Sequence, residues 1–517
     1  MSDRVGRAWA LLPDYLSQHV ILSAAALALG LLVSAVLVIV AVRKERVRWP
    51  VLAFASLIQT VPSLALLALF YPLLLALSGL AEGLFGDGFS ALGFLPSLLA
   101  LALYSMLPIV RNGVAGVLNV DPALIEAARG VGMTEWQRLW RVELPLAMPL
   151  LMAGIRTAAV WVIGGATLST PIGQVSLGNY IFSGLQVQDW VSVLFGCVAA
   201  AALALATDQL LGIIETGVAR RRRGRVIVGA VVLMAGIAVA ALPGRPAATT
   251  TYVVGAKSFT EQFILAELMA ERIAAAGGGA ERRAGLGSAI VFGALASGDI
   301  DVYVDYSGTI WTNVMRRQDN PGREAMLAEI RAWLEREHGI LMLGSLGFEN
   351  AYALAMRRAL AERLGIATIA DLAAHSELKM GGDFEFFARP EWQAVRERYG
   401  LDLAAQREFE STFMYQAVVD GEVDVISAFT TDGRIAAYDL KLLADPVGAI
   451  PPYDAIVLIA RDKANDALLR EALTPLVGAI SREQMQEANN RVDREAGKET
   501  PAGAAQWLAR AIGVRAR

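Results

Sequence analysis

Aromatic side chains stand beside turn-forming residues at several places in the second half of the chain. Tyr306 lies in a segment that ends at Gly308-Thr309, Tyr352 follows Asn350, and Tyr453 follows two prolines. A quaternary ammonium group has no N–H to donate, so a protein binds it through π faces and dispersion, each cation–π contact giving about 0.5–2 kcal/mol. Several tyrosines around one cleft would suit such a ligand, although any single aromatic is more often part of a core. Other members of the pattern are Tyr303, Trp311, Phe348, Phe384, Phe386, Phe387, Tyr415 and Phe429.

Signatures of catalysis are missing from the sequence. It contains neither Gly-x-x-x-x-Gly-Lys-Ser/Thr nor Gly-x-Ser-x-Gly, and Gly285-x-Gly287 lacks the third glycine of a dinucleotide site. The three histidines are scattered and Cys197 is the single cysteine, which argues against a metal site or a disulfide in the second half. We therefore expect no catalytic residue, metal or cofactor on this chain.

The chain of 517 residues divides into two halves of different character. Its composition is 55% hydrophobic, yet the long apolar runs stop near Leu242. Up to Pro243 it carries 16 Lys and Arg against 12 Asp and Glu, whereas the rest carries 30 against 38. An acidic soluble half argues against a nucleic-acid partner, because binders of nucleic acid need a basic face.

Six apolar runs approach the length of about 20 residues that a membrane-spanning helix requires. Lys and Arg collect in alternate loops, near Arg43, near Arg138 and at 220–225, and the positive-inside rule places these loops in the cytoplasm. We therefore expect the N-terminus and everything after Leu242 to be external. The expected spans are 21–42, 51–78, 92–110, 148–170, 190–216 and 226–242.

One polar segment, residues 126–145, lies between strongly apolar runs. A polar segment of this length cannot sit in hydrocarbon, where each unsatisfied polar group costs several kcal/mol, so we expect a loop at a membrane face. Trp136 and Trp140 fall at a rough one-face spacing that predicts a helical centre, and Gly130 and Gly132 allow a sharp bend before it. An ordinary amphipathic loop helix would show the same pattern.

From Tyr252 onward, short β-rich runs alternate with helical ones, which indicates an α/β fold of two lobes around a cleft. Ser258 to Glu261 gives a helix-capping signal. The expected strands are 252–255, 300–304, 351–356, 423–429 and 455–460, and the expected helices are 262–276, 324–338, 358–364, 390–399, 412–420 and 468–479.

The polar segment resembles the signature loop of ABC importer permeases, with Val142 where that family usually has Ile. In the family this loop is a coupling helix that docks on a cytoplasmic ATPase. The flanks at 58–64 and 152–157 look like its glycine betaine/carnitine/choline branch, and the likeness covers most of residues 20–217. The fold implied is an all-α membrane domain of the type I permease class. The positions that match the loop, and hence the implied ATPase contacts, are Glu126, Ala127, Ala128, Gly132, Leu144 and Pro145.

The second half resembles the substrate-binding protein of the same quaternary-amine importers, which has the type II periplasmic-binding fold. The likeness spans nearly all of residues 252–517. By this resemblance Tyr306, Tyr352 and Tyr453 match an aromatic cage, and Phe429 stands where we would expect Tyr. The blocks that carry it are 255–262, 298–309, 421–426, 431–435 and 451–454.

The same resemblance implies polar contacts to the ligand from Gln262, Thr309 and Thr431. Thr260 and Gln262 also open a helix, where free N–H groups favour an anionic end such as a carboxylate. The ligand implied is glycine betaine, choline, carnitine or proline betaine. Ergothioneine, a trimethylated histidine betaine, is an alternative, because fused importers of this kind include its transporters.

The two resemblances together predict a permease fused to its own binding protein in the bacterial inner membrane. The expected domains are a permease domain 1–217 with a coupling loop 126–145, a segment 218–251 with an Arg cluster, sixth span and linker, and an external binding domain 252–517. The expected partners are a cytoplasmic ABC ATPase that hydrolyses the ATP, a second copy of this chain, membrane lipid and a small quaternary amine.

Two function classes compete with transport. A membrane receptor could use the same binding domain to signal, but it would not need an ATPase-docking loop. A membrane enzyme would need a catalytic constellation, which the sequence lacks.

Overall fold

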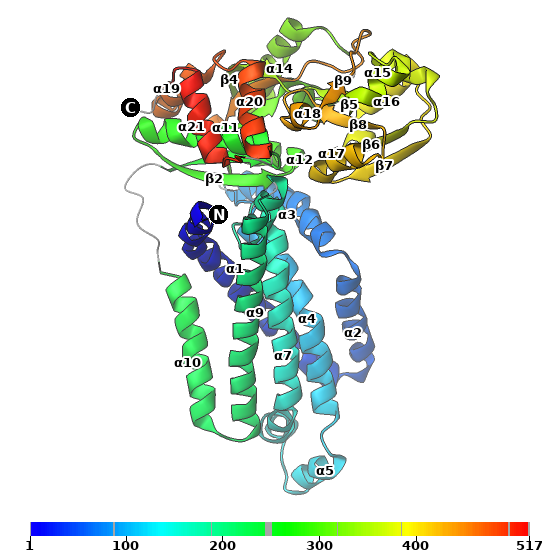
Figure 1. The fold of residues 1–517 in the computed structure, drawn as a ribbon. Coiled ribbons are helices and arrows are strands. Elements are labelled where there is room, and N and C mark those ends of the chain that lie inside the picture. The colour runs from blue at the N-terminus through cyan, green and yellow to red at the C-terminus, as the bar shows by residue number, and fades with distance from the viewer. Residues whose placement is uncertain are drawn as a thin grey trace. The chain divides into compact units, whose positions relative to one another are not determined.

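The computed structural model describes residues 2–85, 88–187, 189–242, 251–317, 319–383, 385–494 and 497–514. The chain folds as two compact units, a helical one that ends with α10 and an α/β one that starts at β1 (Figure 1). Phe384 and residues 243–250, which belong to the expected linker, lie outside the described residues.

The helical unit contains six helical stretches that are long and apolar enough to cross a membrane, as far as the described residues go, and this confirms the expected number. These are α1 from Ala8 onward, α3, α4, the continuous stretch Glu135–Ile172, α9 and α10. Its elements are α1 (Ser2–Arg43), α2 (Glu45–Thr60), α3 (Ser63–Phe85), α4 (Phe94–Leu118), α5 (Pro122–Gly130), α6 (Glu135–Arg138), the π-helix η1 (Leu139–Glu143), α7 (Leu144–Ala166), η2 (Thr167–Ile172), α8 (Gly178–Gln186), α9 (Trp190–Ala219) and α10 (Arg223–Ala240).

The second expected span, 51–78, is wrong as a single helix. The chain breaks at Val61 and Pro62, where Val61 is extended with φ −74° and ψ 127°. Proline has no N–H and disfavours a helical residue before it, so α2 ends at Thr60 and only α3 is long and apolar enough to span. The Tyr104 hydroxyl donates to the Val61 carbonyl and attaches the break to α4.

Close packing of α4 against α7 builds the centre of the helical unit. Gly154 lies so near α4 that a Cβ there would stand 2.6 Å from the Pro108 carbonyl oxygen. Charged groups inside a membrane protein are costly unless paired. Arg156 of α7 accordingly donates to both carboxylate oxygens of Asp208 in α9, at 2.9 and 2.8 Å, and to Glu215 at 2.7 Å.

The α/β unit has two five-stranded sheets, one in each lobe, which confirms the expected α/β fold (Figure 1). In the first sheet β1 is parallel to β2 and β3, and β10 is antiparallel to β3 and β4; in the second, β6 is parallel to β7 and β8, and β5 is antiparallel to β8 and β9. The first sheet has the order β2 (Gly279–Leu286), β1 (Thr251–Lys257), β3 (Val302–Tyr306), β10 (Asp454–Ile459), β4 (Leu341–Glu349), and the second the order β7 (Ala405–Phe409), β6 (Lys379–Asp383), β8 (Val425–Phe429), β5 (Tyr352–Arg357), β9 (Leu440–Leu442).

The chain passes between the lobes twice, at 350–351 after β4 and at 443–453 before β10. All five expected strands exist, as β1, β3, β5, β8 and β10 with slightly different ends, and the six expected helices correspond to α11, α14, α15, α16, α17 and α19 with η7. The helices are α11 (Thr260–Ala275), α12 (Ser288–Ser297), α13 (Ser307–Thr309), η3 (Ile310–Val314), α14 (Arg323–His338), α15 (Arg358–Leu364), η4 (Ile369–Ala374), η5 (Phe386–Ala388), α16 (Pro390–Tyr399), α17 (Ser411–Asp420), α18 (Arg434–Ala437), η6 (Arg461–Lys463), α19 (Ala467–Leu473), η7 (Thr474–Leu476), α20 (Arg482–Asp493) and α21 (Pro501–Ala511).

Two glycines of α7 should respond in opposite directions to the same substitution. Gly154→Ala places a methyl group 2.6 Å from the Pro108 oxygen and should destabilise the membrane domain by about 1–3 kcal/mol, because α4 and α7 must separate. Gly164→Ala meets nothing within 4 Å and should be neutral or stabilising by up to about 1 kcal/mol, because alanine loses less backbone entropy. Thermal unfolding of the detergent-solubilised chain measures both, and equal shifts would contradict the packing.

Candidate functional site

A cavity of about 250 Å³ in the α/β unit is lined from both lobes and from the crossings between them. Five of the seven residues expected to bind substrate line it: Tyr306, Thr309, Tyr352, Phe429 and Tyr453. The cavity also exposes residues that the sequence analysis did not single out for binding, among them Lys257, Ser258, Phe259, Asn350, Arg389 and Glu410.

Aromatic rings follow one another along the cavity. Phe259 stacks on Phe429 at a centroid distance of 6.0 Å and an interplanar angle of 4°, and Tyr306 lies 6.0 Å from Phe259. Tyr352 lies 4.8 Å from Phe429 and meets Tyr453 edge-on at 6.0 Å. Tyr306 belongs to the first sheet, whereas Tyr352 and Phe429 belong to the second. The rings therefore come together only because the two lobes face each other.

The ring of Tyr453 packs directly against a glycine. A Cβ at Gly308 would lie 2.4 Å from the Tyr453 ring, so only glycine leaves room for the ring at the start of α13. The residues before Tyr453 are the two prolines that the sequence analysis noted, and the residue after it begins β10.

A buried arginine carries hydrogen-bond donors that the protein leaves unused. The side chain of Arg389 is 7% exposed, and its guanidinium carbon lies 5.0 Å from the centroid of the Tyr352 ring. Nη2 donates to Glu385 at 3.1 Å, whereas Nε and Nη1 have no hydrogen-bond partner among the described residues. Buried polar groups are normally hydrogen-bonded, so these two donors are exceptional; Nη1 lies 3.6 Å from a carboxylate oxygen of Glu391 without bonding to it.

A second cation lies under another cage tyrosine. The Lys257 ammonium forms an ion pair with Asp305 and lies 5.3 Å from the centroid of the Tyr306 ring. Lys257 ends β1 and Asp305 lies in β3, so neighbouring strands bring the pair together.

One acceptor on the cavity wall is also without a partner. Asp383 ends β6, and its Oδ1 accepts the backbone N–H groups of Glu385 and Phe386, each at 2.9 Å. Its Oδ2 has no hydrogen-bond partner among the described residues. Burial raises the pKa of the Asp383 carboxyl, although the two N–H groups act in the opposite direction.

Two of the expected substrate-binding residues point elsewhere. The side-chain oxygen of Gln262 accepts from the backbone N–H of Lys257 at 3.2 Å, and its amide nitrogen donates to the Val304 carbonyl at 3.0 Å. The Thr431 hydroxyl donates to Glu261 at 2.5 Å. Both side chains are buried and neither lines the cavity, so they support its wall from behind.

Glu261 is the centre of this supporting network. Its carboxylate accepts hydrogen bonds from four side chains: Tyr306 at 2.6 Å, Thr431 at 2.5 Å, and Asn350 and Asn489 at 3.1 Å each. Burial raises the pKa of the Glu261 carboxyl, and the four donors oppose this shift. One carboxylate therefore joins Tyr306 of the first sheet, Asn350 of the first crossing and Thr431, which follows β8 of the second sheet.

The capping signal that included Glu261 was wrong. Phe259 is the N-cap of α11 and provides no side-chain cap, because the Thr260 hydroxyl donates to Asp493 at 2.8 Å instead of to the helix backbone. A carboxylate in a first helical turn carries no sequence signal of a distant partner, so the sequence does not predict this network.

The expected coupling loop forms two short helices joined by a bend. Gly132 has φ +78° between α5 and α6, and Thr134 and Gln137 form a capping box that starts α6. The predicted helical centre and the bend at Gly132 are therefore present. Glu126 and Ala127 are exposed, Ala128 is buried, and Leu144 and Pro145 begin α7, so the loop continues directly into a spanning helix.

The loop exposes its apolar side chains. Val131, Trp136 and Trp140 are 74%, 57% and 59% exposed, while Leu139 is buried. The rough one-face spacing therefore does not make a buried face in the chain by itself. Exposed aromatic patches on a domain commonly mark contact sites for another protein.

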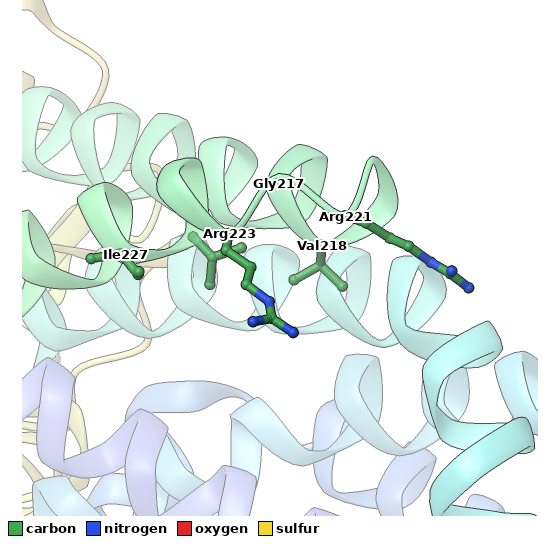
Figure 2. Close-up of a pocket in the computed structure, with 6 residues that line it drawn as sticks. Gly217, Val218, Arg221, Arg223 and Ile227 are labelled. Atoms are coloured by element: carbon green, nitrogen blue, oxygen red, sulfur yellow. The ribbon is translucent and has the colours of Figure 1, made fainter.

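A second hollow, of about 340 Å³, lies at the turn from α9 to α10. Figure 2 shows the side chains of Arg221 and Arg223 extending from this turn, beside Val218 and Ile227. Its lining has neither an aromatic face nor a carboxylate. It is a weaker candidate for a small zwitterion than the aromatic cavity.

The chain matches two known families over almost its whole length. Residues 21–220 match the inner membrane component of binding-protein-dependent transport systems. Residues 250–510 match the substrate-binding domain of the ABC-type glycine betaine transport system.

Individual relatives agree with these families. The ergothioneine transport permease/ergothioneine binding protein of Helicobacter pylori (strain G27) is 29% identical and is matched over 86% of this chain and 80% of its own length. The glycine betaine/carnitine/choline transport permease of Bacillus subtilis (strain 168) is 38% identical over 38% of this chain and 84% of its own length. The carnitine transport permease of Listeria monocytogenes is 40% identical over the same share of this chain and 84% of its own length.

Apolar spanning helices, a signature loop and a two-lobed aromatic cavity thus occur in one polypeptide with both family matches, and the chain belongs to the binding-protein-dependent ABC transporters, as a multi-pass inner-membrane permease fused to a substrate-binding domain of the glycine betaine transport type.

Proposed function

We propose that this chain captures a small zwitterion bearing a quaternary ammonium group and a carboxylate, and imports it across the inner membrane. The observation that carries the proposal is the pairing of an aromatic cage with the two unused donors of buried Arg389 in one cavity. A cage alone would suit any quaternary amine, whereas the arginine adds a place for an anion.

The cage supplies the ammonium end of the site. Five aromatic residues line one cavity, and a quaternary ammonium ion gains about 0.5–2 kcal/mol from each ring face it contacts. They are Phe259, Tyr306, Tyr352, Phe429 and Tyr453. Phe429 in place of tyrosine keeps the ring face and removes only a hydroxyl.

Arg389 supplies the carboxylate end. Hydrogen bonds between charged groups are about twice as strong as neutral ones, so a carboxylate bonded to Nε or to Nη1 would be held firmly; these two N–H groups point in different directions and do not form a fork to one carboxylate. Choline has a hydroxyl in place of a carboxylate and offers Arg389 only a neutral acceptor. The site therefore favours betaines over choline.

Among betaines, ergothioneine is favoured by a separate observation. The unpaired Oδ2 of Asp383 needs a hydrogen-bond partner, and the imidazole-thione ring of ergothioneine has N–H groups, whereas glycine betaine has none. The Helicobacter pylori relative is named for ergothioneine. Glycine betaine and carnitine are the second candidates, in keeping with the names of the Bacillus and Listeria relatives.

Transport places further demands on the chain. The exposed aromatic loop around Gly132 suits docking on a cytoplasmic ABC ATPase, which would hydrolyse the ATP. The signature loop would carry this contact through Glu126, Ala127, Ala128, Gly132, Leu144 and Pro145. Two copies of the chain would form the channel, with lipid around them and the binding domains on the external face. The separate ATPase, the homodimer and the external domain are parts of this proposal.

The carboxylate site is tested with the purified full chain. Arg389→Gln should weaken binding of ergothioneine and glycine betaine roughly 10- to 100-fold, because a charged hydrogen bond contributes about 1.5–3 kcal/mol. Choline should lose much less, since it has no carboxylate. Isothermal titration gives the three dissociation constants for each protein. Equal losses for choline and the betaines would contradict a carboxylate contact at Arg389, and no binding of any of the three to the wild type would refute the proposed function.

Gly308 tests the position of the cage ring. Gly308→Ala must displace the Tyr453 ring, which lies 2.4 Å from the added methyl group, and should weaken ligand binding roughly 3- to 30-fold. Gly503→Ala in α21 is the control, because its Cβ meets only ordinary contacts, with the Thr500 hydroxyl at 3.4 Å and the Glu499 side chain at 3.6 and 3.8 Å. An unchanged dissociation constant in the Gly308 variant would mean that Tyr453 does not contact the ligand.

Coupling is tested at the bend of the loop. Gly132→Ala should reduce uptake and spare ligand binding, because alanine at φ +78° costs about 1–2 kcal/mol and shifts α5 against α6. Gly130→Ala has the same open surroundings without a positive φ and should retain uptake. Uptake by proteoliposomes with the ATPase and ligand binding by the same variants are compared. Loss of binding together with uptake would contradict a role confined to coupling.

A further inference from the structure

Two tyrosines of the cage donate their hydroxyl groups to buried carboxylates. Tyr453 donates to Glu391 and Tyr306 donates to Glu261. The third, Tyr352, has no hydrogen-bond partner for its hydroxyl among the described residues and instead has Arg389 against its ring. The carboxylates stand behind the rings, since neither Glu391 nor Glu261 lines the cavity.

A phenol that donates to a carboxylate is a better partner for a cation. The hydrogen bond to an ionised acceptor is strong and moves electron density from the O–H bond onto the oxygen and the ring. Cation–π attraction depends on the negative charge of the ring face, so it increases when the hydroxyl is bonded in this way. Burial and Glu391 raise the pKa of Tyr453 well above its usual value, so the phenol keeps its proton and remains the donor.

Glu391 is a buried residue whose carboxylate accepts the hydrogen bond from Tyr453. It lies in the first turn of α16, after Pro390, and is 2% exposed. The oxygen that accepts from Tyr453 also lies 2.9 Å from the Thr312 hydroxyl, and 3.6 Å from Nη1 of Arg389. The other carboxylate oxygen has no hydrogen-bond partner among the described residues. A buried carboxylate with a free oxygen is costly, and the structure retains it beside the cage.

We propose that Glu391 determines specificity for cationic ligands by acting through the hydroxyl of Tyr453. The inference rests on the proposed function and deepens it, since it names a positioning residue outside the cavity that makes the site prefer an ammonium group over a neutral group of the same shape. Glu261 stands in the same relation to Tyr306, but it also accepts from Asn350 at the first crossing and from Thr431 of the second lobe, so its replacement would change more than the ring.

The test uses a pair of ligands that differ only in charge at one end. Glycine betaine and 3,3-dimethylbutanoate share a carboxylate and a shape, but the second has an uncharged tert-butyl group. The ratio of their dissociation constants, measured by isothermal titration with the full chain, cancels contributions from Arg389 and from packing. Glu391→Gln should lower the preference for glycine betaine about three- to tenfold, a part of one cation–π contact.

A double-mutant comparison identifies the route. Tyr453→Phe should lower the same preference as Glu391→Gln does, and adding Glu391→Gln to Tyr453→Phe should lower it no further, because the hydroxyl is the link between them. Tyr453→Phe removes a single oxygen, so it provides the measurement even if Glu391→Gln folds poorly. Tyr399→Phe is the matched control: Tyr399 lies on the same helix and donates to Asp445, but it does not line the cavity.

The outcomes separate this inference from the proposed function. A wild type with no preference for glycine betaine over 3,3-dimethylbutanoate overturns both. A wild-type preference that Glu391→Gln and Tyr453→Phe leave unchanged, while affinities for both ligands fall together, shows a structural role and overturns the inference alone. If the double mutant shows a smaller preference than Tyr453→Phe alone, Glu391 does not act through the hydroxyl, and this result also overturns the inference.

Discussion

The α/β unit depends on the buried carboxylate of Glu261. An unpaired polar group in an interior is costly, and an ionised one more so, but here four side-chain donors surround it. Asn350 lies at the first crossing, Thr431 follows β8 of the second sheet, and Tyr306 lines the cavity. One acceptor therefore links a ring of the cavity wall with the first crossing and with the second lobe.

In the membrane unit, too, charged groups on neighbouring helices are paired with one another. Hydrocarbon offers no hydrogen bonds, so the charges of Arg156, Asp208 and Glu215 satisfy one another between α7 and α9. α7 also receives the coupling loop directly, because α6, η1 and α7 form one continuous helical stretch. The loop is therefore continuous with a helix that is packed closely through Gly154 on α4 and paired through Arg156 with α9.

The cavity combines opposite charges without neutralising every group. Lys257 is paired with Asp305, and Arg389 with Glu385, yet Arg389 retains two donors and Asp383 one acceptor without partners. These unsatisfied groups surround ring faces that attract cations. On the function proposed above, these groups would meet a zwitterion that also carries a hydrogen-bond donor, while the hydroxyls of Tyr306 and Tyr453 bond to carboxylates behind the wall.

The amino-acid pattern predicted the elements that are defined by their own composition. Six apolar spans and the strands β1, β3, β5, β8 and β10 follow from local runs of apolar residues, and the bend at Gly132 follows from glycine itself. The edge strands β2, β4, β7 and β9 have mixed polarity or are short, and β6 contains two glycines. Hydropathy also predicted one span across Pro62, because it counts apolar side chains and takes no account of the N–H group that proline lacks. Five predicted binding residues line the cavity, but Gln262 and Thr431 support it from behind. Phe259 and Arg389 also line it, although the sequence did not predict them as binding residues. Whether a polar side chain faces a ligand or a buried carboxylate depends on which distant residues lie beside it, and that arises only when the two lobes and their crossings pack together.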